Sequence, residues 1–211
     1  MTQYKLSGLY AIADTHLLGD CLLPSVEAAL QGGATLIQYR DKSKHAIKRQ
    51  QQATELQILC NRYHATLIIN DDIELASTVR AAGVHLGESD ADYTEARARL
   101  GDDAIIGISC YNQLARAKRA AALGADYIAF GSVFPSASKP NAVHAPLTLF
   151  QEALSFDVPL CAIGGINASN AKLIVDAGAD MIAVIQGLFN KPNIQGAAQQ
   201  LSSLFETATA K

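Results

Sequence analysis

The stretch LGADYIAF, residues 123–130, joins a helical sequence to a strand through a glycine. The Ala/Arg-rich run before it has helical character, and the β-rich residues after it are typical of a buried strand. A helix that ends in this way needs a left-handed residue, a conformation that glycine adopts readily. The same joint recurs as GGATLI at 32–37, AAGVHL at 81–86 and AGADMIAV at 177–184. We therefore expect equivalent helix-to-strand units to begin at four glycines: Gly33, Gly83, Gly124 and Gly178.

Short apolar, β-rich runs recur along the whole chain, with helical sequences between most of them. Strands that alternate with helices predict a parallel sheet with right-handed crossovers. A count of eight strands, and the lack of a G-x-G-x-x-G motif in the first unit, favour a single (β/α)₈ TIM barrel over residues 1–211, rather than a doubly wound open sheet. The expected strands are GLYAIAD (8–14), ATLIQYR (34–40), TLIIND (66–71), GVHLG (83–87), AIIGISC (104–110), DYIAFGS (126–132), PLCAIGG (159–165) and MIAVIQG (181–187).

The composition is that of a soluble globular protein, with 49% hydrophobic and 18% charged residues. A net charge of −3 argues against nucleic acid as a partner. The sequence shows neither a secretory leader nor a run of about 18 apolar residues, so we expect no membrane association and a cytoplasmic location. It leaves the oligomeric state open, a homo-oligomer included. Without a Cys-x-x-Cys or Cys/His cluster, the cysteines are expected to be structural: Cys21, Cys60, Cys110 and Cys161.

The segment LIQYRDK, residues 36–42, changes from apolar to cationic at its C-terminal end. Alternation places Gln38, Arg40 and Lys42 on one face of the strand and Asp41 on the other. One interpretation is a strand end that frays into a solvated loop. In a TIM barrel, however, this end lies at the active-site mouth, where Lys139 from the sixth strand would join the two cations and hold a diphosphate. Neutral donors nearby would be Asn70, Ser109, Ser136 and Ser138.

Two carboxylates follow the third and fourth strands, which are neighbours in a barrel. Asp71 and Asp90, together with phosphate oxygens and water, would suit Mg²⁺, which prefers hard oxygen ligands. Each aspartate taken alone is equally typical of a helix N-cap. Asp72 fits that capping role better, because it directly precedes a helical run. The cationic mouth beside them therefore favours a metal site at Asp71 and Asp90.

Glycine-containing loops follow the last two predicted strands, as AIGGIN at 162–167 and VIQGLFN at 184–190. Loops at these positions of a TIM barrel often bind a phosphate through backbone N–H groups. Gly164 and Gly165 would permit close approach because they carry no Cβ. The mouth thus has two predicted anion sites, as an enzyme that joins two phosphorylated small molecules would need.

The chain resembles the thiamine-phosphate synthase family over nearly its whole length. The resemblance implies a TIM barrel that joins a pyrimidine diphosphate to a thiazole phosphate, and releases thiamine phosphate and pyrophosphate. The segments that carry it are QYRDK (38–42), IINDD (68–72), GVHLGESD (83–90), GISCYN (107–112), FGSVFPSASK (130–139), AIGGI (162–166) and AVIQGLF (183–189).

Matched position by position, this resemblance implies three sites. The pyrimidine diphosphate would be bound by Gln38, Arg40, Asp41, Lys42, Asn70, Ser109 and Lys139, with catalytic roles for Arg40, Lys42, Ser109 and Lys139. The implied cofactor, Mg²⁺, would be bound by Asp71 and Asp90. The thiazole phosphate would be bound by Ser136, Ser138, Gly165, Ile185 and Gln186, the last three largely through backbone groups.

The mechanism implied by the resemblance is dissociative. Pyrophosphate leaves first, the aminopyrimidine delocalises the resulting cation, and the thiazole nitrogen attacks it. The cations and the metal then stabilise charge on the leaving group. Because no general base is needed, the histidines are expected to be structural or surface residues: His16, His45, His64, His85 and His144.

Some positions depart from the family pattern. Ser136 and Ser138 stand where threonine is common, and Gln186 stands where serine is common. Tyr111 stands where a histidine is common, and a resemblance to the related thiazole tautomerases would rest on that histidine, so its absence disfavours a tautomerase. A non-catalytic sensor of thiamine phosphates would need neither the metal carboxylates nor the leaving-group cations, and both are present. A synthase is therefore favoured over both alternatives.

Overall fold

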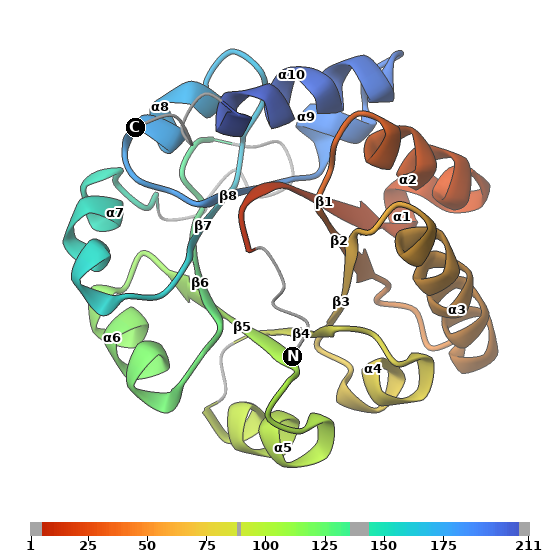
Figure 1. Cartoon of the computed structure of the whole chain (residues 1–211), viewed down its shortest axis with the longest axis horizontal. Helices are drawn as coiled ribbons and strands as arrows, with labels where there is room; N and C mark the ends of the chain where they lie inside the picture. The colour runs from red at the N-terminus through yellow and green to blue at the C-terminus, as the bar shows by residue number, and fades with distance from the viewer. Residues whose placement is uncertain (1–5, 88–89, 136–143, 207–211) are drawn as a thin grey trace.

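The computed structural model describes residues 6–87, 90–135 and 144–206. Within these ranges, eight parallel strands pair in chain order and close into a barrel, with helices around the outside (Figure 1). The predicted TIM barrel is therefore confirmed. The strands are β1 (Gly8–Asp14), β2 (Leu36–Arg40), β3 (Thr66–Asn70), β4 (Gly83–Leu86), β5 (Ile105–Tyr111), β6 (Tyr127–Gly131), β7 (Leu160–Ile163) and β8 (Met181–Val184).

Helices connect the strands and cover the outer surface of the barrel (Figure 1). Those of the first half are α1 (Thr15–Leu18), η1 (Gly19–Cys21), α2 (Leu22–Gln31), α3 (Ala46–Arg62), α4 (Ile73–Val79) and α5 (Asp90–Leu100). Those of the second half are α6 (Leu114–Leu123), α7 (Thr148–Ala153), η2 (Leu154–Phe156), α8 (Ala171–Asp176), α9 (Gln186–Phe189) and α10 (Ile194–Glu206).

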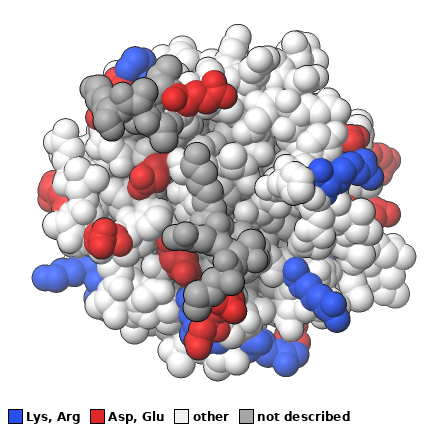
Figure 2. All heavy atoms as spheres, viewed as in Figure 1, with Lys and Arg blue, Asp and Glu red and all other residues white. Residues whose placement is uncertain are grey.

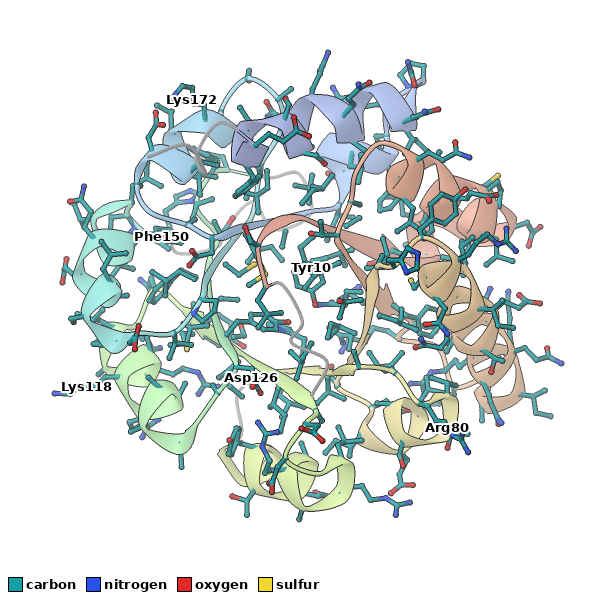
Figure 3. All side chains as sticks on the ribbon, viewed as in Figure 1. Tyr10, Arg80, Lys118, Asp126, Phe150 and Lys172 are labelled. Carbon is teal, nitrogen blue, oxygen red and sulfur yellow. The ribbon has the colours of Figure 1, made fainter. Side chains whose placement is uncertain are left out.

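Alternation along the strands divides the apolar core into two layers. In β2, Leu36 lies in the barrel interior, whereas Ile37 and Tyr39 pack between the sheet and the helices, as the pattern predicts. Figure 3 shows the same division, with Tyr10 inside the barrel and Phe150 on its outer side. The inner layer consists of Tyr10, Ile12, Leu36, Ile68, Ile105, Tyr127, Ala129, Cys161, Met181 and Ala183.

Three of the four predicted joint glycines adopt the left-handed conformation. Gly33, Gly124 and Gly178 have φ angles of 93°, 88° and 102°. The prediction for Gly83 is wrong, because the left-handed residue that caps α4 is instead Arg80, which has a φ of 54° and donates its N–H back into the helix. Gly83 is a glycine for another reason. A Cβ built on it would lie 1.8 Å from the carbonyl oxygen of Ile105, so only glycine lets β4 approach β5 so closely.

Gly83→Ala is accordingly expected to destabilise the protein by about 3 kcal/mol or more, since the added methyl group would displace the β5 backbone. Gly87→Ala is the matched control just beyond β4, because the nearest atom lies 4.0 Å from its Cβ position. Urea denaturation of the two variants measures the difference. Equal unfolding midpoints for both would contradict the close approach of the two strands.

Charged residues of both signs are distributed over the face drawn in Figure 2. On the face drawn in Figure 2, Lys and Arg side chains are interspersed with Asp and Glu and form no single basic patch. Among the described residues, no helix is long and apolar enough to cross a bilayer. Cys60, Cys110 and Cys161 are buried, whereas Cys21 is exposed.

Candidate active site at the mouth of the barrel

Two of the predicted diphosphate-binding cations are described, and both contact carboxylates at the C-terminal ends of the strands. Arg40, the last residue of β2, forms an ion pair with Asp14, the last residue of β1. Lys42 extends over β3, where its Nζ lies 2.5 Å from Oδ2 of Asp71. Alternation thus brings both cations to the mouth as predicted, and each is held by a carboxylate from a neighbouring strand.

A cavity of about 540 Å³ borders both of these cations. It lies between α1 and the beginning of α3, and its lining includes His16, His45 and Lys48. The Arg40 side chain is 34% exposed and that of Lys42 is 58% exposed. The two cations therefore have open space in which to exchange a carboxylate partner for an anionic ligand.

The Asp71 carboxylate is the centre of a small polar cluster on β3 and the loop after it. Oδ2 of Asp71 accepts hydrogen bonds from Lys42 and, at 2.9 Å, from Nδ2 of Asn70. The residue adopts a left-handed φ of 61°, stabilised by a hydrogen bond from its N–H to the carbonyl of His85 in β4. A non-glycine residue in this conformation is uncommon and often has a functional reason. The carboxylate therefore points to the mouth, close to the end of β4.

The adjacent residue, Asp72, has a different role. Its Oδ1 accepts a hydrogen bond of 2.8 Å from the N–H of Leu75 and caps α4, so the predicted helix cap is confirmed. Its Oδ2 pairs with Arg49 at 2.6 Å. Of these two consecutive aspartates, Asp71 therefore lies at the mouth and Asp72 lies at a helix terminus.

Gln38 lies deeper in the barrel than the cations, and its side chain is buried. Its Nε2 donates a hydrogen bond of 2.8 Å to the hydroxyl of Tyr10. Ser109 follows Ile105 and Gly107 on the inner face of β5 by alternation. Gln38 and Ser109 therefore provide neutral polar groups on opposite sides of Asn70 and Asp71.

Asp41 faces the other side of β2, as alternation predicts. Its carboxylate accepts hydrogen bonds from the N–H of Ser43 at 2.6 Å and from the hydroxyl of Tyr39 at 3.2 Å. Burial raises the pKa of Asp41, but hydrogen bonds from Ser43, Thr15 and Tyr39 together outweigh this effect and leave the pKa below its usual value. We interpret Asp41 as ordering the loop that carries Lys42, rather than as a direct ligand.

The loops after β7 and β8 lie against each other. A Cβ on Gly187 would lie 2.0 Å from the carbonyl oxygen of Ile166, so α9 begins in contact with the β7 loop. Gly165 has a φ of 64°, and a Cβ there would lie 2.5 Å from the carbonyl oxygen of Pro135. The space next to Gly165 is thus filled by protein, so packing and φ already require this glycine. Gly165, Ile185 and Gln186 are nevertheless brought to one place, as predicted.

Several predicted site residues lie outside the described part of the structure. These are Ser136, Ser138 and Lys139, which follow β6. Asp90 begins α5, but its side chain is not described. Gly87, the residue directly after β4, lies beside Asp71, because a Cβ built on Gly87 would lie 4.0 Å from Oδ1 of Asp71. Among the described side chains, no group of at least three His, Cys, Asp or Glu residues forms a metal site.

Sequence reasoning gave no role at the mouth to two residues that support it. His85 was expected to be a structural or surface residue, and it lies inside the barrel, as a structural residue would, where burial lowers its pKa to about 4. Arg116 is also buried, and it donates hydrogen bonds to the carbonyls of Ser109 at 2.7 Å and Gly87 at 2.5 Å. It thereby joins the ends of β4 and β5. The inward register of His85 was a usable signal, but Arg116 on a helix offered none.

Comparison with known proteins finds relatives that span nearly the whole chain. A family model described as thiamine monophosphate synthase matches residues 9–188. The thiamine-phosphate synthase of Thioalkalivibrio sulfidiphilus is 50% identical over 207 residues, covering 97% of this chain and 98% of the relative. That of Nitrosococcus oceani is 54% identical over 196 residues, covering 92% and 90%. The solved structure of thiamine phosphate pyrophosphorylase from Pyrococcus furiosus superposes with a TM-score of 0.87 at 34% identity, covering 97% and 98%. The chain belongs to the thiamine monophosphate synthase family.

Proposed function

We propose that this protein condenses 4-amino-2-methyl-5-(diphosphooxymethyl)pyrimidine with 4-methyl-5-(2-phosphoethyl)thiazole, and produces thiamine phosphate and pyrophosphate. The observation that carries the proposal is the convergence of Arg40, Lys42, Asn70 and Asp71 at one end of the barrel. Family membership and the names of the relatives support the same reaction.

In this proposal the cations act on the leaving group. Arg40 and Lys42 would move from Asp14 and Asp71 to the diphosphate, and Lys139 would join them. Charge-assisted hydrogen bonds to the departing oxygens become stronger as negative charge develops there, so they lower the barrier to loss of pyrophosphate. The pyrimidine cation that remains would react with the thiazole nitrogen, and none of these steps needs a general base.

The residues present fit a magnesium ion. The Asp71 carboxylate already binds a cation, the Lys42 ammonium group, and it is 48% exposed at the mouth. Asp71 and Asp90 would hold Mg²⁺, with the diphosphate and water providing the remaining oxygen ligands. When bound, the metal would supply positive charge that stabilises the leaving pyrophosphate. Lys42 would then be released to contact the phosphate.

The thiazole phosphate would bind on the opposite side of the mouth, at the loops after β7 and β8. Ile163 and Ile185 pack on the inner apolar layer there and provide an apolar surface beside backbone groups. Gly165, Ile185 and Gln186 would donate backbone N–H groups to the phosphate, and Ser136 and Ser138 would add hydroxyl groups.

Gln186→Ser is expected to leave the KM for the thiazole phosphate unchanged, because this assignment uses the backbone N–H and not the side chain. Gly165→Val is expected to raise that KM strongly. The cause would be a clash with Pro135 that displaces the loop, rather than direct contact with the phosphate. Steady-state kinetics with varied thiazole phosphate measure both. Loss of binding in Gln186→Ser alone would show that the backbone assignment is wrong.

Incubation of the purified protein with both substrates and Mg²⁺ tests the proposed function. We expect thiamine phosphate and pyrophosphate in equal amounts, detected by chromatography and by a coupled phosphate assay. Omitting either substrate is the control, since loss of pyrophosphate without the thiazole would reveal hydrolysis. Absence of thiamine phosphate under these conditions would refute the proposal.

A further inference from the structure

The Arg116 side chain connects β4 and β5 at a defined place in the sheet. The ladder between these two strands ends with the pair of Leu86 and Ile108. The next pair in this register is Gly87 and Ser109, which we call the rim pair. Arg116 donates to both of their carbonyl oxygens, from Nη2 at 2.5 Å to Gly87 and from Nε at 2.7 Å to Ser109. The guanidinium therefore continues the connection between the strands one residue beyond their last ladder pair.

The helix that carries Arg116 does not explain an arginine at this position. Arg116 lies in the first turn of α6, where the helix dipole disfavours a positive charge. The residue is only 7% exposed, and burial of a charge is unfavourable unless hydrogen bonds compensate it. The two carbonyl oxygens of the rim pair provide such hydrogen bonds. The place of Arg116 is therefore explained by the strand ends that it joins.

The same guanidinium borders a β-bulge in β5. The pairing of β5 with β6 shifts by one residue between Ser109 and Tyr111, which leaves Cys110 as the extra residue. Tyr111 has a left-handed φ of 54°, and the Arg116 guanidinium lies 5.8 Å from the centre of its ring. Arg116 thus contacts the chain on both sides of the bulge. Because a slip by one residue would turn Ser109 away from the mouth, these contacts also hold Ser109 in its inward register.

The rim pair lies beside groups to which the proposed function gives the diphosphate substrate. Ser109 is itself one of these groups. A Cβ built on Gly87 would lie 4.0 Å from Oδ1 of Asp71, whose Oδ2 binds Lys42. A change in the distance between the ends of β4 and β5 would therefore move Ser109 relative to Asp71. It would leave the loops after β7 and β8 in place.

We propose that Arg116 is a positioning residue, which fixes the distance between the ends of β4 and β5 and thereby holds Ser109 and Asp71 in the arrangement that binds the diphosphate substrate. Arg116 acts through the rim pair and does not contact the substrate. The effect on a substrate rests on the proposed function, whereas the fixed distance between the strand ends does not. The planar guanidinium suits this role because its nitrogen atoms reach two acceptors at once, which a lysine ammonium group on a flexible stem does less well.

Arg97 provides a matched control at the other end of the barrel. Its Nη1 also donates to backbone carbonyls, at 3.1, 3.1 and 2.7 Å to those of Gly101, Asp102 and Ala104. Its guanidinium also lies 5.8 Å from the centre of a tyrosine ring, that of Tyr93. The three carbonyl groups precede β5, so they lie at the end of the barrel opposite the mouth. Loss of Arg97 therefore removes interactions of the same kind without altering the mouth.

Hydrogen exchange measured by mass spectrometry tests the role of Arg116 without any substrate. Arg116→Met keeps an apolar stem and removes the guanidinium. Amides in peptides that contain Gly87 or Ser109 should exchange about tenfold faster in this variant than in the wild type, because the strand ends separate more often. In Arg97→Met, faster exchange should be confined to the opposite end of the barrel. Unchanged exchange at the rim pair in Arg116→Met would overturn the proposal, whether or not the protein makes thiamine phosphate.

Steady-state kinetics with each substrate varied in turn test the positioning role. The KM for the pyrimidine diphosphate should rise about tenfold in Arg116→Met, because small displacements of binding groups have large effects on binding and rate. The KM for the thiazole phosphate should stay at the wild-type value. Partial unfolding would instead lower kcat and leave both KM values unchanged, and this is the result expected for Arg97→Met. An unchanged KM for the pyrimidine diphosphate in Arg116→Met would refute the positioning role.

Arg116→Lys is the conservative variant, and it carries both measurements if Arg116→Met does not fold. It keeps the charge but holds the two carbonyl groups less well, so it should change exchange and KM in the same direction by about threefold. Wild-type values in Arg116→Lys would show that a positive charge is sufficient and would overturn the role of the guanidinium. Faster exchange at the rim pair in a protein that makes no thiamine phosphate would support the connection between the strand ends and refute the proposed function.

Discussion

Arg40→Ala should lower kcat/KM for the pyrimidine diphosphate by at least about 30-fold, or about 2 kcal/mol of transition-state stabilisation. The lost group is the guanidinium, which would form charge-assisted hydrogen bonds with the leaving pyrophosphate. The variant should unfold at nearly the same temperature as the wild type, since Arg40 ends β2 beside an open cavity. Steady-state kinetics and a thermal melt on the same preparation measure the two quantities.

Arg99→Ala is the control for this substitution. Arg99 also pairs with a carboxylate, Glu74, through two hydrogen bonds of 2.9 Å, but it does so on exposed surface between α4 and α5. Exposed ion pairs contribute little to stability, so the fold of this variant should be unchanged. Its kcat/KM should therefore equal that of the wild type. A value of kcat/KM for Arg40→Ala that also matches the wild type would show that Arg40 belongs only to its ion pair with Asp14.

The second large effect is the dependence of the synthesis rate on Mg²⁺. Removal of Mg²⁺ with EDTA should abolish synthesis, and added Mg²⁺ should restore it. Asp71→Asn should need a higher Mg²⁺ concentration for half-maximal rate, because the change removes a negative charge that would face the cation. Asp90→Asn should behave likewise, whereas Arg40→Ala should lower the rate without a comparable rise in the Mg²⁺ requirement. Titration of Mg²⁺ at saturating substrates compares the variants.

Asp72→Asn provides the matched control, since it changes the same residue type one position away. Asp72 caps α4 and pairs with Arg49, so its loss should cost roughly 1 kcal/mol of stability and leave the Mg²⁺ dependence unchanged. If Asp71→Asn and Asp72→Asn had the same Mg²⁺ dependence as the wild type, the Asp71 carboxylate would have no part in a metal site.

Much of the candidate site could be read from strand ends alone. Gln38, Arg40 and Lys42 share a face because side chains alternate along any extended strand, and parallel strands in a barrel end at the same rim. The helix cap at Asp72 follows from its place before a helical run. The prediction of a left-handed conformation at Gly83 was wrong for an equally clear reason. A glycine after a helix can form a turn or permit the close approach of two strands, and the sequence alone does not distinguish these two uses.

The sequence by itself therefore determined the barrel, the inward and outward faces of its strands, and which residues reach the mouth, because these follow from local periodicity. Only the tertiary structure decided which side chains meet. Arg40 pairs with Asp14, 26 residues away, and Tyr10 meets Tyr127, 117 residues away. Such pairs depend on the stagger and closure of the barrel, which set the height of each residue relative to distant strands. That height is a property of the closed sheet, and no single strand encodes it.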